Sequence, residues 1–142
     1  MSYATIGDIR AKVSIRTIDG NSDPSVQEVV SYIDQIAADI DTALAGQGYD
    51  VPVSASSTTA FSWLGLCNAY GAAMLTEAAS AKGKESPHLE FLERQYERRL
   101  KQIMDGEITL PGVAPATSAA VPRAGGKVVA SALFMATGFD QR

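Results

Sequence analysis

The sequence predicts a mostly α-helical fold, in which a small helical bundle precedes an extended C-terminal arm. Apolar residues recur three and four positions apart in three long segments, which is the spacing of one helix face. Turn-forming residues separate these segments, and proline and glycine become frequent after Gly106, where the helical spacing ends. We therefore expect one helical domain over residues 1–106 and a Pro/Gly-rich arm with an apolar tip over residues 107–142.

The N-terminal segment carries the pattern of a short helix. Thr5 is a suitable cap, and Asp8 stands in the first turn, where a negative charge suits the helix dipole. Ile6, Ile9 and Val13 share one side of such a helix. The pattern predicts a helix from Thr5 to about Val13 that depends on tertiary packing, because so short a helix is unstable alone.

A long amphipathic helix is predicted next. Residues 19–24 are dense in turn formers and end in Asp23, a candidate cap, and Pro24, which suits the first helical position. Gly46 and Gly48 are expected to stop this helix. The apolar positions with the spacing of one helical face are Val26, Val29, Val30, Ile33, Ile36, Ala37, Ile40, Ala43 and Leu44.

Residues 49–53 form a short extended piece with Pro52, residues 54–59 form a polar loop, and a second long helix is predicted over about residues 60–81. This helix mixes large apolar residues with small ones. A glycine such as Gly65 or Gly71 costs a helix about 1 kcal/mol relative to alanine. Close approach by a neighbouring helix is the reason we infer for them, and we expect this helix to be central.

The third long helix is predicted to start at Ser86-Pro87, a cap followed by proline, and to run to about Asp105. Its charged residues are spaced to pair across one turn, Glu90 with Arg94 and Glu97 with Lys101. Its buried stripe is predicted to contain Leu89, Leu92, Tyr96, Leu100 and Ile103.

The chain becomes apolar again beyond the Pro/Gly-rich segment, from Lys127 to Arg142. An apolar tip of this kind is seldom left in water, so it either docks on a partner or folds back onto its own helices. The residues that we expect to dock on a partner are Val128, Val129, Leu133, Phe134, Met135 and Phe139.

Charge and composition restrict the possible functions. The net charge of -4 excludes general adhesion to nucleic acid. The first residues lack the features of a signal peptide, and no apolar run is long enough to span a membrane, so we expect neither export by that route nor a membrane partner. Cys67 is the only cysteine, which excludes an internal disulfide and suits a reducing compartment.

Few residues are candidates for chemistry. His88 is the only histidine, and we interpret it as a solvated residue at a helix end. Cys67 lies among apolar and small residues and is interpreted as a buried structural thiol. Neither belongs to a metal set or a nucleophile–base pair, so we expect no cofactor and no enzyme activity. Asp34 and Asp41 are spaced to share one side of a helix, where they could bind a cation, act in acid-base chemistry or form a solvated polar flank, the interpretation we favour.

The last predicted helix has basic residues, but acidic residues on the same helix oppose a nucleic-acid face. No row of aromatic residues for base stacking accompanies them. We therefore interpret this helix face as solvated and self-paired. The basic residues are Arg94, Arg98, Arg99 and Lys101.

Two stretches carry a family resemblance, the opening Tyr3-Ala4-Thr5-Ile6-Gly7-Asp8-Ile9-Arg10 and the loop Gly48-Tyr49-Asp50-Val51-Pro52. Together with the order and length of segments 26–44, 60–81 and 89–104, they resemble the head-tail connector, or adaptor, proteins of long-tailed bacteriophages. The resemblance covers most of the chain. The opening stretch is similar to the short first helix of those connectors.

The resemblance implies a structural virion protein that is assembled in the host cytoplasm. Such proteins form a ring, here expected to be twelve-fold, that joins the portal protein to a further head-tail joining protein and prolongs the channel through which DNA passes without specific binding. Their C-terminal segments grip a neighbouring virion protein, which suits the arm of this chain. The arm is longer than in smaller relatives, so the resemblance does not identify its partner.

Asp34 and Asp41 are candidates for facing such a channel, where their charge would keep DNA from adhering. A different class of function also fits the composition, a small helical regulator that binds and inhibits a cellular enzyme. An enzyme is the third alternative and the one least favoured by the residues present.

Overall fold

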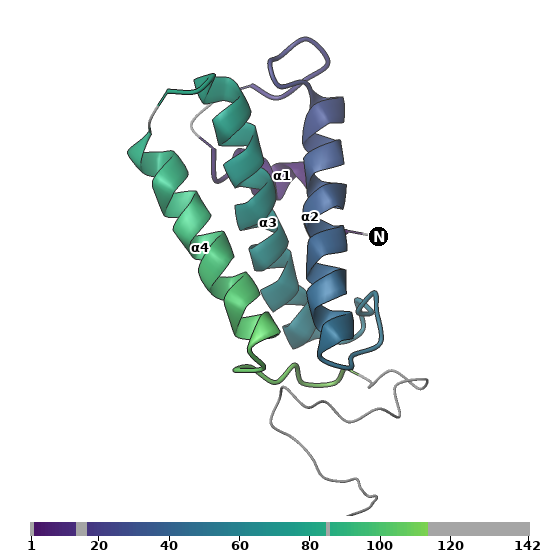
Figure 1. Cartoon of the computed structure of the whole chain (residues 1–142). Coiled ribbons are helices and arrows are strands. Elements are labelled where there is room, and N and C mark those ends of the chain that lie inside the picture. The colour runs from purple at the N-terminus through teal and green to yellow at the C-terminus, as the bar shows by residue number, and fades with distance from the viewer. Residues whose placement is uncertain (1, 14–16, 85, 114–142) are drawn as a thin grey trace, which may run out of the picture.

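The computed structural model describes residues 2–13, 17–84 and 86–113. These residues form the predicted mostly helical bundle (Figure 1), with α3 between α2 and α4 and the short α1 lying across α2 and α3. The central position predicted for the small-residue helix is confirmed, because α3 lies between the two other long helices and packs most extensively on both. The helix bounds are Ile6–Arg10 for α1, Val26–Gly46 for α2, Thr58–Ala81 for α3 and Pro87–Met104 for α4.

The N-terminal cap of α1 is the one that the sequence predicts. The Thr5 side chain accepts a hydrogen bond from the backbone N–H of Asp8, and the Asp8 carboxylate accepts one from the Thr5 N–H at 2.8 Å. This capping box satisfies N–H groups that a helix start otherwise leaves unpaired. The helix ends at Arg10 and not at Val13, so it has little more than one turn.

The predicted start of α2 is wrong by two residues. Ser25 caps α2 and forms a capping box with Glu28, while Pro24 is buried ahead of the cap. Asp23 instead forms an ion pair at 2.8 Å with Lys82, the residue that follows the end of α3. Both Ser25 and Asp23 are good caps, and the glutamate three residues after Ser25 is the feature that distinguishes them. The predicted end at Gly46 is confirmed.

Gly71 brings the three long helices together, as the small residues of this segment predict. A Cβ atom at Gly71 would lie 2.6 Å from Cγ2 of Ile36 on α2 and 2.9 Å from the Tyr96 ring on α4. Gly65 also marks a close approach, but its neighbour is the backbone of Tyr3, whose carbonyl oxygen would lie 2.8 Å from such an atom. A residue larger than glycine would separate these elements.

The start of α4 at Pro87 behind the Ser86 cap is confirmed, and the helix ends at Met104. The predicted pairing of Lys101 with Glu97 is wrong, because Lys101 pairs with Asp105 at 2.5 Å, one turn further along. Both partners are four residues from Lys101. An exposed pair of this kind adds little to stability, so its choice of partner has little effect on the fold.

Residues 107–113, the first part of the predicted arm, lie against the base of the bundle, which we define as the end that carries the α2–α3 connection (Figure 1). Leu110 is buried, and Ile108 packs beside it. The Leu110 N–H donates to the Tyr49 hydroxyl at 3.3 Å. This part of the chain therefore belongs to the hydrophobic core in spite of its proline and glycine content.

The substitution Gly71→Ala tests the helix contact. We expect it to lower the free energy of unfolding by about 1–3 kcal/mol, because overpacking outweighs the better helix propensity of alanine. Urea unfolding measures the effect. Gly46→Ala is the matched control, since no atom lies within 4 Å of a Cβ there and stability should be unchanged or slightly higher. Equal stability of both variants would contradict the packing described.

Candidate functional site

The N-terminal segment is fastened to the bundle at one point, the Tyr3 junction, which we define as Tyr3, Asp41, Val53 and Asn68. These residues come from the N-terminal segment, α2, the α2–α3 connection and α3. Tyr3, Val53 and Asn68 are each at most 5% exposed, and Asp41 is half-buried. Four parts of the chain that are far apart in the sequence thus meet in the core.

Asn68 supplies the buried half of the junction. Its side-chain oxygen accepts hydrogen bonds from the backbone N–H groups of Tyr3 at 2.9 Å and Ala4 at 3.1 Å. Its amide nitrogen donates to the carbonyl oxygen of Ile33 on α2 at 3.1 Å. A buried amide with these partners holds the N-terminal segment against α3 and α3 against α2.

The Tyr3 hydroxyl supplies the other half. It donates to the Asp41 carboxylate at 2.5 Å and accepts from the backbone N–H of Val53 at 2.9 Å. Burial, and then the hydrogen bond to Asp41, raise the pKa of Tyr3 above its ordinary value. The phenol therefore stays protonated and able to donate over the physiological range of pH.

The chain leaves the described region close to this junction. The Ser57 hydroxyl, at the cap of α3, donates to the Gly112 carbonyl oxygen at 2.9 Å, and the Gln47 amide donates to the Met104 carbonyl oxygen at 2.8 Å. These bonds attach the end of α4 and the segment after it to the α2–α3 connection. The base of the bundle therefore carries both that connection and the point where the arm departs.

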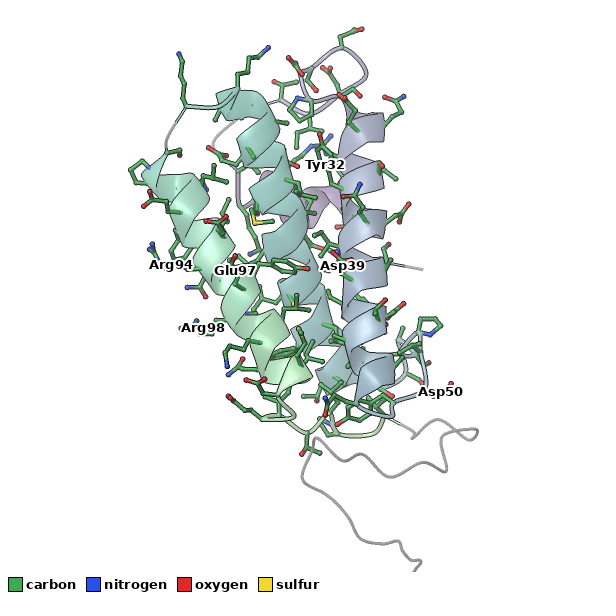
Figure 2. The ribbon with its side chains drawn as sticks, viewed as in Figure 1. Tyr32, Asp39, Asp50, Arg94, Glu97 and Arg98 are labelled. Carbon is green, nitrogen blue, oxygen red and sulfur yellow. The ribbon has the colours of Figure 1, made fainter. Side chains whose placement is uncertain are left out.

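The two aspartates predicted to face a channel have different surroundings. Asp34 is exposed on α2, whereas Asp41 is half-buried and bound by Tyr3. Asp39, labelled on α2 in Figure 2, is exposed as well. The spacing that places Asp34 and Asp41 on similar sides of α2 therefore does not give them equal access to a ligand.

The six residues predicted to dock on a partner lie outside the described residues. They are Val128, Val129, Leu133, Phe134, Met135 and Phe139. Only the first part of the predicted arm, residues 107–113, is described, and it covers the base of the bundle.

The basic residues of α4 divide between the surface and the core side. Figure 2 shows Arg94 and Arg98 on the outer side of α4, where Arg98 donates to Gln95. Arg99 turns inward and lies over the rings of Trp63 and Tyr70 at 5.4 and 5.6 Å. The Arg99 guanidinium is therefore engaged by aromatic rings of the same protein, and the basic residues of α4 form no continuous row on its surface.

His88 lies in the first turn of α4 as predicted, but the prediction that it is solvated is wrong. Its ring is half-buried and stacks on Phe91 with centroids 6.3 Å apart. Its Nε2 atom lies 2.5 Å from the carbonyl oxygen of Lys12, just after α1. His88 thus connects the end of α1 to the start of α4, a structural contact that the sequence pattern could not reveal.

Cys67 is fully buried in α3, as predicted. Burial raises the pKa of its thiol to about 12, although Arg99 acts in the opposite direction. A thiol of this kind stays protonated and is a poor nucleophile.

Within residues 2–13, 17–84 and 86–113, no three acidic, histidine or cysteine side chains gather as a metal site would require. No helix in the same residues is long and apolar enough to cross a bilayer.

No protein-family profile, curated protein or solved structure matches the chain.

The substitution Tyr3→Phe removes the hydroxyl of the junction and leaves the buried Val53 N–H without its acceptor. We expect the free energy of unfolding to fall by about 2 kcal/mol in a urea titration. Tyr32→Phe removes a tyrosine hydroxyl from α2 outside the junction and should change stability by less than about 0.5 kcal/mol. A Tyr3→Phe protein as stable as the wild type would show that the junction does not fasten the N-terminal segment.

Stability should also depend on pH through Cys67. In the unfolded chain the thiol ionises near its ordinary pKa of 9.0, whereas in the folded protein it stays protonated to about 12. Stability is therefore fully present below pH 9 and falls as the pH rises. Between pH 8 and pH 10 we expect a loss of about 1.4 kcal/mol from this group.

The test is urea unfolding of wild type and Cys67→Ala at pH 8 and pH 10, below the range where the raised pKa values of Tyr3 and Tyr96 contribute most. Whatever its stability at pH 8, the variant should lose about 1.4 kcal/mol less than the wild type over this interval. An identical loss in both proteins would contradict the assignment.

Proposed function

We propose that the protein is a subunit of a head-tail connector, a ring that joins a bacteriophage portal to a further head-tail joining protein. Twelve subunits would surround and prolong the DNA channel, in a virion assembled in the host cytoplasm. The protein then acts by assembly and catalyses no reaction. This function requires a rigid subunit core, a projecting segment that grips a partner, and a channel surface to which DNA does not adhere.

The observation that carries the proposal is the Tyr3 junction. The resemblance to connectors depends most on the opening stretch around Tyr3 and on the loop from Gly48 to Pro52. The Val53 N–H, immediately after that loop, donates to the Tyr3 hydroxyl at 2.9 Å. The two stretches therefore act together as one structural unit, which supports treating them as parts of a single family pattern.

The position of the arm adds support. Residues 107–113 cover the base of the bundle, and the bond from Ser57 to Gly112 fixes where the chain departs. Every subunit of a ring would project its arm from the same end toward the same partner. We propose the portal as that partner, which the apolar tip grips by hydrophobic contact or by adding a strand to a sheet edge.

The charge of α2 suits a surface that DNA passes. Its four ionisable acids, Glu28, Asp34, Asp39 and Asp41, are accompanied by no lysine or arginine on the helix. Asp34 is exposed and free to repel phosphate, whereas Asp41 is engaged by Tyr3. We therefore propose Asp34 as the channel-facing member of the predicted pair.

Substitutions in the apolar tip test portal binding. Leu133→Asp combined with Phe134→Asp should weaken the complex with the portal at least about 100-fold, because two buried apolar side chains are replaced by charges. Light scattering of the full chain mixed with the portal measures the complex.

Ser131→Asp combined with Thr137→Asp is the matched control, since it adds the same charge to the same segment and keeps the apolar residues. It should bind within about ten-fold of wild type. A wild-type protein that stays monomeric with and without the portal would contradict the connector proposal and favour the small helical regulator.

A further inference from the structure

Large apolar residues lie on several sides of α3 near its N-terminal end. Phe61, Trp63, Leu64 and Leu66 follow one another at intervals that place them on different sides of the helix. A helix of this kind is normally covered on all sides. Leu64 is buried in the core, but Phe61 and Leu66 remain half-exposed among the described residues.

An open groove borders Phe61 and Leu66 on α3. It has a volume of about 540 Å³ and runs between α1 with its flanking residues and the first half of α3. The five-residue α1 is too short to cover α3 fully, and the closest approach is at Gly65. The α3 side of its lining is mainly apolar, whereas Thr5, Asp8 and Lys12 contribute polar and charged groups from the α1 side. The lining residues used below are Phe61, Ser62, Gly65, Leu66 and Ala69.

The chain that follows the described region departs near the start of α3. The Ser57 hydroxyl holds the Gly112 carbonyl oxygen at the start of α3. Leu66 lies nine residues further along α3, a distance of about 14 Å. Residues 114–126 number thirteen and span up to about 43 Å when extended, so residues 127–142 have the reach to enter the groove of their own subunit.

The chemistry of the two surfaces matches. The segment after Lys127 contains Leu133, Phe134 and Met135 in succession, flanked by small residues. Burial of large apolar side chains of this kind away from water is favourable. The groove offers the half-buried side chains of Phe61 and Leu66 as apolar partners.

We infer that the groove between α1 and α3 binds the C-terminal apolar segment, residues 128–139, of the same chain. A tether of thirteen residues gives the segment a millimolar effective concentration at its own groove, which favours it over a second copy in dilute solution. The groove covers the apolar segment until a partner removes it. The portal then competes with the groove for the same side chains, a step that the connector function does not itself require.

Disulfide cross-linking of the full chain tests the inference. Ser62→Cys places a thiol on the rim of the groove, and Ala136→Cys places one in the segment without removing a large apolar side chain. We expect oxidation at micromolar protein concentration to join them within one chain. The native Cys67 should not form cross-links because it is fully buried.

Ser56→Cys with Ala136→Cys is the matched control. Ser56 is exposed and lies at the same end of α3, closer to where the chain departs, but outside the groove lining. A docked segment should cross-link to Ser62→Cys at least about ten-fold faster than to Ser56→Cys, which corresponds to about 1.4 kcal/mol of preference. Equal rates would overturn the inference.

Two further variants separate docking from a chance encounter. Leu66→Asp in the groove or Phe134→Asp in the segment should each remove the rate difference, while circular dichroism shows that the helices remain. Phe134→Asp changes no described residue, so it still tests docking of the segment if Leu66→Asp fails to fold. A rate difference that survives Phe134→Asp would overturn the inference.

Mixing isotope-labelled and unlabelled protein identifies the occupant by mass spectrometry. Cross-links within one chain are expected, and cross-links mainly between chains would show that a second copy fills the groove, which contradicts the assignment. A protein that fails to bind the portal but shows the groove cross-link would refute the proposed function and leave this inference intact.

Discussion

The buried side chain of Asn68 makes three hydrogen bonds that the rest of the bundle cannot replace. Two of them hold the backbone of Tyr3 and Ala4, and the third reaches Ile33 on α2. Because the N-terminal segment is held here, its backbone approaches α3 closely enough to require glycine at position 65. The Tyr3 hydroxyl is then placed to bond both Asp41 and the Val53 N–H. One amide thus determines how the opening segment, α2, α3 and the loop between them fit together.

The helices could be predicted because their signals are local. Caps such as Thr5 and Ser86, the spacing of apolar residues, and the terminating Gly46 all act within a few residues of where they stand. Gly71 was informative for a different reason, since a glycine inside a long helix has a cost that only close packing explains. The predicted start of α2 is wrong because Asp23 and Ser25, two residues apart, are both good caps, and only the reciprocal bond of Glu28 decides between them.

The contacts between distant segments could not be predicted in this way. Asn68 is the only amide in an otherwise apolar part of α3, which is the signal that could have drawn attention to it. Its partners at Tyr3 and Ala4 are 65 and 64 residues away, and no spacing rule identifies them. The same limit applies to His88 and Lys12, and to Asp41, whose carboxylate has a partner that Asp34 lacks. The sequence therefore located the candidate residues on α2 but not their accessibility.

The described bundle and the end that carries residues 107–113 suit the proposed assembly into a ring. Native mass spectrometry of the full chain mixed with its candidate portal measures this most directly, because it counts the subunits in each complex. The account predicts one closed ring of this protein for each portal ring, with twelve subunits in both. Monomers that remain free at every ratio of the two proteins, or a single copy bound to each partner, would contradict it.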